Sequence, residues 1–333
     1  MKVDKNESFV SKQANKKMVL FTVFIILIAA QLIAAPAWIG NIIANSVPAN
    51  FDIYWNQVTP ENATRWGSVE RSRDNMNWGT ADTIYNYAQS RGILFKQHCF
   101  VWGSQEPNWV SGLSQSEQLA EVTEWYQAVA ARYSSLDMID VVNESLHAKP
   151  SYRNALGGNG ATGWDWVSRA FEMARQYFPN CKLLINEYGI ISDPNATSQY
   201  MNIINLLKQR NLVDGIGIQT HQFNMNNVTT STMTSVLNTL KSSGLPIYSS
   251  ELDIDGVDTT QLNRYMEKFP VLYNNCAGIT LWGYIQDQTW KPNTHLVSSG
   301  NIGASERPAM QWLKQYLNSS PPDTPIPTPD GTP

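Results

Sequence analysis

The chain has 333 residues, a formal net charge of −4 and 16% charged residues, which suits one large domain with flanking tails. Its only basic cluster is a group of lysines among the first 17 residues, so a nucleic-acid-binding surface, which needs clustered Lys and Arg, is excluded. Twelve Trp and fourteen Tyr favour a sugar ligand, because flat aromatic rings stack on the apolar C–H faces of sugars; any single ring could equally belong to the core.

The N-terminal segment predicts export. Residues 18–35 form an apolar run that five lysines precede, a pattern typical of a signal peptide or of an uncleaved signal anchor. Ala35-Pro36-Ala37 supplies the small residues of a cleavage site. Residues 1–37 are therefore either removed or kept as a membrane anchor through residues 18–35. In both cases we expect the rest of the chain to lie outside the cytoplasm, secreted or anchored facing outward.

Between the tails, residues 38–318 alternate β-rich apolar segments with amphipathic ones. This order is typical of parallel strands joined by crossover helices, and eight strands in about 280 residues predict a single (β/α)8 TIM barrel of the α/β class. No glycine-rich nucleotide loop follows the first strand, which disfavours a dinucleotide-binding fold. The expected strands are residues 38–43, 51–58, 93–102, 138–143, 182–187, 215–220, 246–251 and 278–283. The expected helices are residues 80–91, 116–133, 165–177, 197–210, 232–242, 259–268 and 308–317.

One connection looks irregular. Only about seven residues, 44–50, separate the first two expected strands, too few for a crossover helix. The three cysteines are also uninformative, since an odd number leaves at least one thiol without an intrachain partner. Cys99 lies in an apolar stretch and is expected to be a buried small hydrophobe, whereas pairing of Cys181 with Cys276 stays open.

The C-terminal segment, residues 319–333, is rich in Pro and Thr. Such a composition cannot bury a core and predicts an extended linker or a plain disordered tail. A linker would be consistent with an appended sugar-binding module beyond it.

Carboxylates at strand ends are the candidate catalytic groups. Active sites of such barrels lie at the C-terminal ends of the strands, where Glu144 follows the fourth expected strand and Glu251 ends the seventh. Hydrolysis of a glycosidic bond needs two carboxyl groups, one to protonate the leaving oxygen and one to attack or to activate water. Position alone is weak evidence, because Glu187 and Asp287 also lie near strand ends.

Six motifs, each near a strand end, strengthen this assignment because they resemble glycoside hydrolase family 10, the endo-β-1,4-xylanases, in family order. The resemblance runs from Trp38 to about Leu317. The motifs are WNQVTPEN at residues 55–62, QHCFVW at 97–102, DVVNE at 140–144, QTH at 219–221, SELDI at 250–254 and TLWG at 280–283.

No cofactor is expected, and no catalytic metal either, because His147 and His295 show no ligand spacing with a third donor. The resemblance implies a retaining double displacement on xylan. Glu144 would be the acid/base and Glu251 the nucleophile, with carboxyl groups about 5–5.5 Å apart. Asn143 would donate to the sugar 2-hydroxyl, while His221 and then Asp253 would orient Glu251. The implied substrate contacts are Glu61, Asn62, His98, Trp102, Gln105 and Gln219 on the glycone side, Trp282 and Trp290 above the cleaved residue, and Tyr188 on the aglycone side.

Two positions depart from the family pattern. Gly103 stands where a His usually follows the strand-three Trp, and Arg65 stands where a Lys is usual. Both are expected beside the glycone subsites, where losing an imidazole would open space and Arg would change the donor geometry. The chain therefore resembles a divergent branch. Alternatives to xylan are another β-glucan or glycoside, and a non-catalytic glycan-binding barrel is a third hypothesis.

Overall fold

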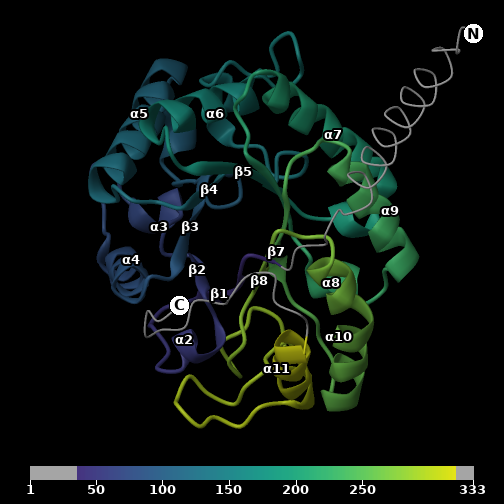
Figure 1. Cartoon of the computed structure of the whole chain (residues 1–333). Helices are drawn as coiled ribbons and strands as arrows, with labels where there is room; N and C mark the ends of the chain where they lie inside the picture. The colour runs from purple at the N-terminus through teal and green to yellow at the C-terminus, as the bar shows by residue number, and fades with distance from the viewer. Residues whose placement is uncertain (1–35, 320–333) are drawn as a thin grey trace, which may run out of the picture. The chain divides into compact units, whose positions relative to one another are not determined.

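The computed structural model describes residues 36–319, and these form a closed barrel of eight parallel strands in sequence order, with β8 paired to β1 (Figure 1). This confirms the (β/α)8 TIM barrel. The apolar run 18–35 and the Pro/Thr-rich segment from residue 320 lie outside the described residues. The strands are β1 (Ile39–Ile43), β2 (Gln57–Pro60), β3 (Leu94–Val101), β4 (Met138–Asn143), β5 (Lys182–Glu187), β6 (Gly215–Ile218), β7 (Ile247–Leu252) and β8 (Gly278–Leu281).

Helices surround the barrel on its outside (Figure 1). The longer ones are α4 (Gly79–Arg91), α5 (Gln115–Arg132), α6 (Asp165–Tyr177), α7 (Pro194–Gln209), α9 (Thr230–Lys241), α10 (Asp258–Tyr273) and α11 (Pro308–Ser319). Single turns are α2 (Phe51–Tyr54), α3 (Trp66–Val69) and α8 (Gln222–Met225), and 3-10 turns are η1 (Val110–Gly112), η2 (Ser151–Asn154) and η3 (Ile190–Ser192). Seven of the expected strands and all seven expected helices are present.

The second expected strand was wrong in its first half. Residues 51–54 form the helical turn α2, and β2 begins only at Gln57. The alternation of apolar and polar residues in this segment imitates a strand, yet Phe51 is buried while Ile53 is 58% exposed. Asn50 anchors the turn through its side-chain amide, which donates to the carbonyls of Ser299 and Asn301. The connection between the first two strands therefore runs from residue 44 to residue 56 and is longer than the seven residues expected.

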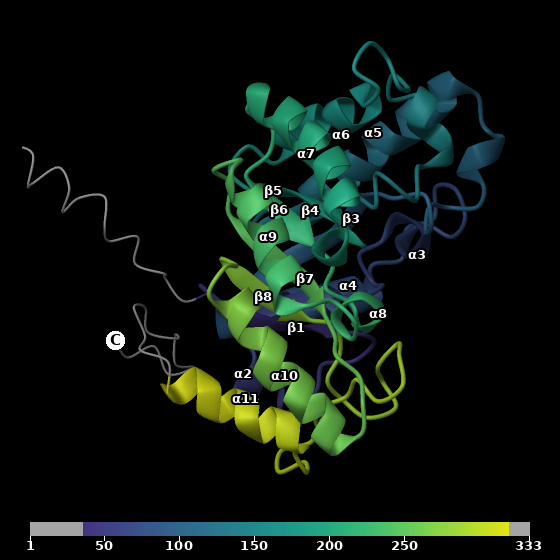
Figure 2. The ribbon, with the colours of Figure 1, turned by 90° about the vertical axis from the view of Figure 1, so that its right-hand side faces the viewer.

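The last part of α10 was also missed. The helix continues through Pro270 to Tyr273, although a proline inside a helix removes one backbone hydrogen bond. Packing offsets this cost, because α10 and α11 lie side by side (Figure 2) and Phe269 meets the rings of Trp312 and Tyr316 edge-on. Burial of these aromatic faces keeps the helix going where local propensity would end it.

The barrel strands are buried on both faces, as expected for a parallel sheet covered by helices. Every residue of β4 is buried, and the space between strands and helices holds large side chains such as Trp125, Trp166 and Phe171. Local signals start the helices: Ser114 and Glu117 form a capping box before α5, and Asp193 caps α7 with Pro194 in its first turn. The strands are thereby held as a rigid frame whose C-terminal ends carry the site.

Cys99, Cys181 and Cys276 are all buried and unpaired, which confirms Cys99 as a buried small hydrophobe and answers the open question about the other two. Among residues 36–319 there is no helix with the length and apolar character that a membrane crossing requires.

Candidate active site

The C-terminal ends of the strands enclose a cleft of about 420 Å³. It brings together most of the predicted site residues, and Phe223 is its one lining residue that sequence reasoning missed. Asn143, His98 and Asp253, which the sequence also singled out, are buried around the cleft and do not line it. The lining residues are Glu61, Asn62, Arg65, Trp102, Gln105, Glu144, Tyr188, Gln219, His221, Phe223, Glu251, Trp282 and Trp290.

Glu144 follows β4 with a left-handed backbone, φ 57°. Its carboxyl group accepts only from neutral groups: Trp102 Nε1 at 2.8 Å on Oε2, and Gln219 Nε2 at 3.2 Å and Asn143 Nδ2 at 3.3 Å on Oε1. Burial raises the pKa of Glu144, and the negative charge of Glu251 adds to this against the effect of the Gln219 and Trp102 donors. A carboxyl group with a raised pKa in a cleft can hold a proton and deliver it to a ligand.

Glu251 lies on β7 and is only 4% exposed. Asn186 Nδ2 donates to its Oε1 at 2.7 Å, and His221 Nε2 lies 3.0 Å from its Oε2. Burial alone would raise the pKa of Glu251, but the hydrogen bond from His221 and the positive charges around it bring the pKa down to about 2. The group is therefore ionised and can act as a nucleophile.

His221 is held between two carboxylates. Its Nδ1 lies 2.9 Å from Asp253 Oδ2, so the structure contains both hydrogen bonds expected of this residue. Burial disfavours the charged imidazole, yet its bonds to Asp253 and Glu251 raise the pKa of His221 to about 9. Asp253 itself accepts from Trp290 Nε1 at 2.5 Å and from the backbone N–H of Gln222 at 2.5 Å. These bonds fix the imidazole and the indole platform in one arrangement.

Asn186 links the surroundings of the two glutamates and was missed in the sequence. Besides Glu251, its Nδ2 donates to Asn143 Oδ1 at 2.9 Å, and its Oδ1 accepts from Ser250 Oγ at 2.5 Å. Asn143 Oδ1 is thereby occupied, and its Nδ2 donates to Glu144. The only local signal for Asn186 in the sequence was that a polar residue stands near the end of β5, directly before Glu187.

The wall of the cleft that the sequence predicts for the glycone side comes from the ends of β2 and β3. Arg65 is 7% exposed, donates to Asn62 Oδ1 at 2.9 Å and lies over the Trp102 ring at 4.8 Å, a cation–π contact. Burial raises the pKa of Glu61 on the same wall, an effect that Arg65 opposes. The Arg65 guanidinium therefore also helps to position the Trp102 ring, whose N–H donates a hydrogen bond to Glu144.

His98 lies deeper, 1% exposed, with its ring edge-on to Trp282 at 5.3 Å. Its Nδ1 is 2.9 Å from Asp140 Oδ2, which also forms an ion pair with Lys96 Nζ at 3.0 Å. Burial lowers the pKa of His98. The contact with Asp140 thus fixes the orientation of the His98 ring through Nδ1.

The hypothesis that Gly103 opens space was wrong. Gly103 does not line the cleft, and a Cβ at this position would lie 2.5 Å from the Lys149 carbonyl oxygen. The backbone N–H of Gly103 donates to the Ala148 carbonyl at 2.9 Å. The chain after β4 therefore fills the place that a side chain at 103 would take.

On the opposite side of the cleft, Tyr188 stacks on His147 at 4.0 Å and meets Phe223 edge-on at 6.2 Å. Phe223 is 41% exposed, as suits a surface for a sugar ring. Glu187, the other acid at the end of β5, accepts from the Leu146 N–H at 2.8 Å and bonds His147 at 2.9 Å. Its role is therefore to hold the chain after β4.

Within residues 36–319 the one cluster of three potential metal ligands is Glu70, Asp74 and Glu121. It lies outside the cleft, and two of its carboxylates already have protein partners: Arg73 pairs with Glu121, and Glu70 accepts from the Asp74 N–H and from Trp66 Nε1.

Comparisons with known proteins agree with this geometry. Endo-1,4-beta-xylanase B of Cellvibrio japonicus (strain Ueda107) is 41% identical over 291 residues, covering 85% of this chain and 46% of that protein, so the chain spans about half the length of this relative. Endo-1,4-beta-xylanase 3 of Hypocrea jecorina (strain QM6a) is 31% identical over 245 residues, covering 72% and 69%. The crystal structure of native xylanase 10B from Thermotoga maritima has the same fold, with a TM-score of 0.72 at 22% identity over 86% of this chain and 95% of that chain. The model of glycosyl hydrolase family 10 matches residues 30–316, and the chain belongs to this family.

Proposed function

We propose that the chain is a retaining endo-β-1,4-xylanase, with Glu144 as acid/base and Glu251 as nucleophile. One observation carries the mechanism: two carboxyl groups in one cleft have pKa values shifted in opposite directions, up for Glu144 and down to about 2 for Glu251. A glycosidase needs this division, because one group must give a proton while the other attacks.

In the first step, the Glu144 carboxyl group gives its proton to the glycosidic oxygen as the bond to the anomeric carbon breaks. A Glu251 carboxylate oxygen bonds to that carbon, and a glycosyl ester forms while the aglycone leaves as an alcohol. In the second step, a water oxygen attacks the anomeric carbon, its proton passes to the ionised Glu144, and the ester bond to Glu251 breaks. Two inversions retain the β configuration.

Asn143 supports the first step. Its Oδ1 is occupied by Asn186 Nδ2 and Gln219 Nε2, and its Nδ2 is held beside Glu144 at the edge of the cleft. A donor fixed in this way binds a sugar 2-hydroxyl, and such a bond strengthens as positive charge develops on the ring. Trp282 and Trp290 form the platform on which that ring rests.

Xylan is the proposed substrate because the curated relatives that match most of this chain are named as xylanases. The test compares release of reducing ends from xylan and from carboxymethylcellulose, with product anomers followed by NMR. We expect xylan cleavage with a β product first; equal or greater activity on carboxymethylcellulose would favour a broader β-glucanase, and an α product would exclude retention.

We also propose that the enzyme acts outside the cytoplasm, either secreted after loss of residues 1–37 or anchored by residues 18–35. The lysines followed by an apolar run support export, and the composition of residues 319–333 supports a linker. N-terminal sequencing of the exported protein distinguishes cleavage from anchoring. Activity confined to the cytoplasm would contradict both.

A further inference from the structure

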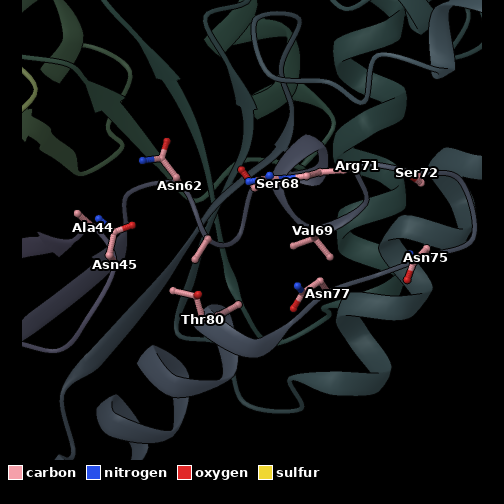
Figure 3. Close-up of a pocket in the computed structure, with 12 residues that line it drawn as sticks. Ala44, Asn45, Asn62, Ser68, Val69, Arg71, Ser72, Asn75, Asn77 and Thr80 are labelled. Atoms are coloured by element: carbon pink, nitrogen blue, oxygen red, sulfur yellow. The ribbon is translucent and has the colours of Figure 1, made fainter.

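A second hollow lies beside the catalytic cleft, with a volume of about 440 Å³. It is bounded by the chain after β1, the chain after β2, helix α3 and the segment that leads into α4. Figure 3 shows its lining side chains, with Asn45 on one edge and Arg71 across from it. Asn62 lines both hollows, so a glycan in the cleft can extend into this one, hereafter the Arg71 basin.

The Arg71 basin differs from the cleft in chemistry. The cleft is lined by three carboxylates, Glu61, Glu144 and Glu251, and by several aromatic rings. No acidic and no aromatic residue lines the basin, whose polar groups are mainly Asn, Ser and Thr side chains around Arg71. Such a surface offers hydrogen bonds to sugar hydroxyls but no stacking platform for a backbone ring.

Arg71 is the unsatisfied group of this surface. Its side chain is exposed, and within residues 36–319 no hydrogen bond or ion pair joins it to another residue. By contrast, Arg73 on the same segment is committed to Glu121 at 2.5 Å. A guanidinium without a partner, in a hollow with no acidic side chain, suits an anionic group, and its planar fork matches a carboxylate.

We propose that the Arg71 basin binds the carboxylate of a uronic-acid branch on the glycone part of the substrate, with Arg71 as its cation. The proposal rests on the proposed function, because it needs a polysaccharide bound across the cleft. The cleft offers acidic side chains to an anionic branch, whereas the adjoining basin offers the Arg71 cation and no acidic side chain. Arg71 is therefore a residue that selects the substituent on the chain and takes no part in bond cleavage.

The test uses two β-1,4-xylo-oligosaccharides of equal backbone length, one unbranched and one with a single glucuronic acid toward its non-reducing end. The wild-type protein, Arg71→Gln, the charge-retaining Arg71→Lys and the control Arg210→Gln are compared by kcat/KM. Arg210 directly follows α7, lines neither hollow and has a 3.7 Å ion pair with Glu172. Each measurement is repeated at high salt, which screens an exposed ion pair.

We expect Arg71→Gln to lower kcat/KM for the branched substrate about tenfold, as for loss of one charge-assisted contact, and to leave the unbranched substrate within about twofold. For the branched substrate, kcat/KM of Arg71→Lys should lie between the values of the wild type and Arg71→Gln, and that of Arg210→Gln should equal the wild-type value. High salt should reduce the preference of the wild-type protein for the branched substrate. Equal losses on both substrates, or no loss on either, overturn the basin proposal while leaving the xylanase proposal standing. Failure of the wild-type protein to cleave the unbranched substrate overturns both.

Discussion

Glu144 and Glu251 border the same cleft, yet their partners differ in kind. Glu144 receives hydrogen bonds from an indole and two amides, which carry no charge, whereas Glu251 receives one from a histidine whose own pKa is about 9. Burial raises the pKa of both groups. The difference between acid and nucleophile therefore comes from the charge of the donor and not from the depth of the carboxyl group. Four substitutions test this comparison, in decreasing order of expected effect.

Replacing the proposed nucleophile should abolish the reaction. Glu251→Ala should lower kcat on xylan by about four orders of magnitude or more, because no group remains to form the glycosyl ester. Reducing-end release measures the loss, and circular dichroism checks folding. Asp287→Asn is the matched control, since Asp287 follows β8, is exposed and has a positive φ that Asn accepts. Equal activity of Glu251→Ala and the unmutated protein would contradict the assignment of Glu251 as nucleophile.

Replacing the proposed acid should make the loss of activity depend on the leaving group. Glu144→Gln should lower kcat on xylan about 10³-fold. An aryl glycoside with an acidic phenol needs no proton on departure, so its glycosylation step should persist and appear as a burst of phenol followed by slow turnover. A loss of equal size on both substrates, without a burst, would show that Glu144 is not the acid.

Removing the charged donor should move the acid limb of the pH profile. In His221→Asn the bond that favours ionised Glu251 is lost, so the pKa of Glu251 rises from about 2 toward its usual range. Glu251 then remains protonated up to a higher pH than in the wild type. As the pH is lowered, kcat/KM should therefore begin to fall at a pH that is higher by one or more units. An unchanged acid limb would show that His221 does not cause the low pKa of Glu251.

Removing a neutral donor should move the other limb, and less. Trp102→Phe keeps an aromatic face for Arg65 but deletes the N–H that stabilises ionised Glu144. The pKa of Glu144 should rise further, so the alkaline limb shifts to higher pH by a few tenths of a unit, with kcat reduced a few-fold. Movement of the acid limb in this variant would contradict the division of roles.

The site was more predictable from the sequence than its surroundings. Glu144 and Glu251 could be found because a strand end is a local signal and barrel topology gathers strand ends together. The turn α2 could not, since Asn50 is anchored by carbonyls some 250 positions away. Asn186 and the filled space at Gly103 were missed for the same reason: each depends on which neighbouring strand or loop supplies the contact.

The left-handed backbone at Glu144 has a consequence for how the enzyme can change over time. A residue with a Cβ in this conformation costs about 1–2 kcal/mol relative to glycine, and burying its carboxyl group beside another adds to the cost. A mutation to Gly at 144 would relieve that strain, so selection for heat tolerance alone favours losing the proposed acid. A thermostable descendant that still cleaves its substrate must gain its stability elsewhere in the barrel.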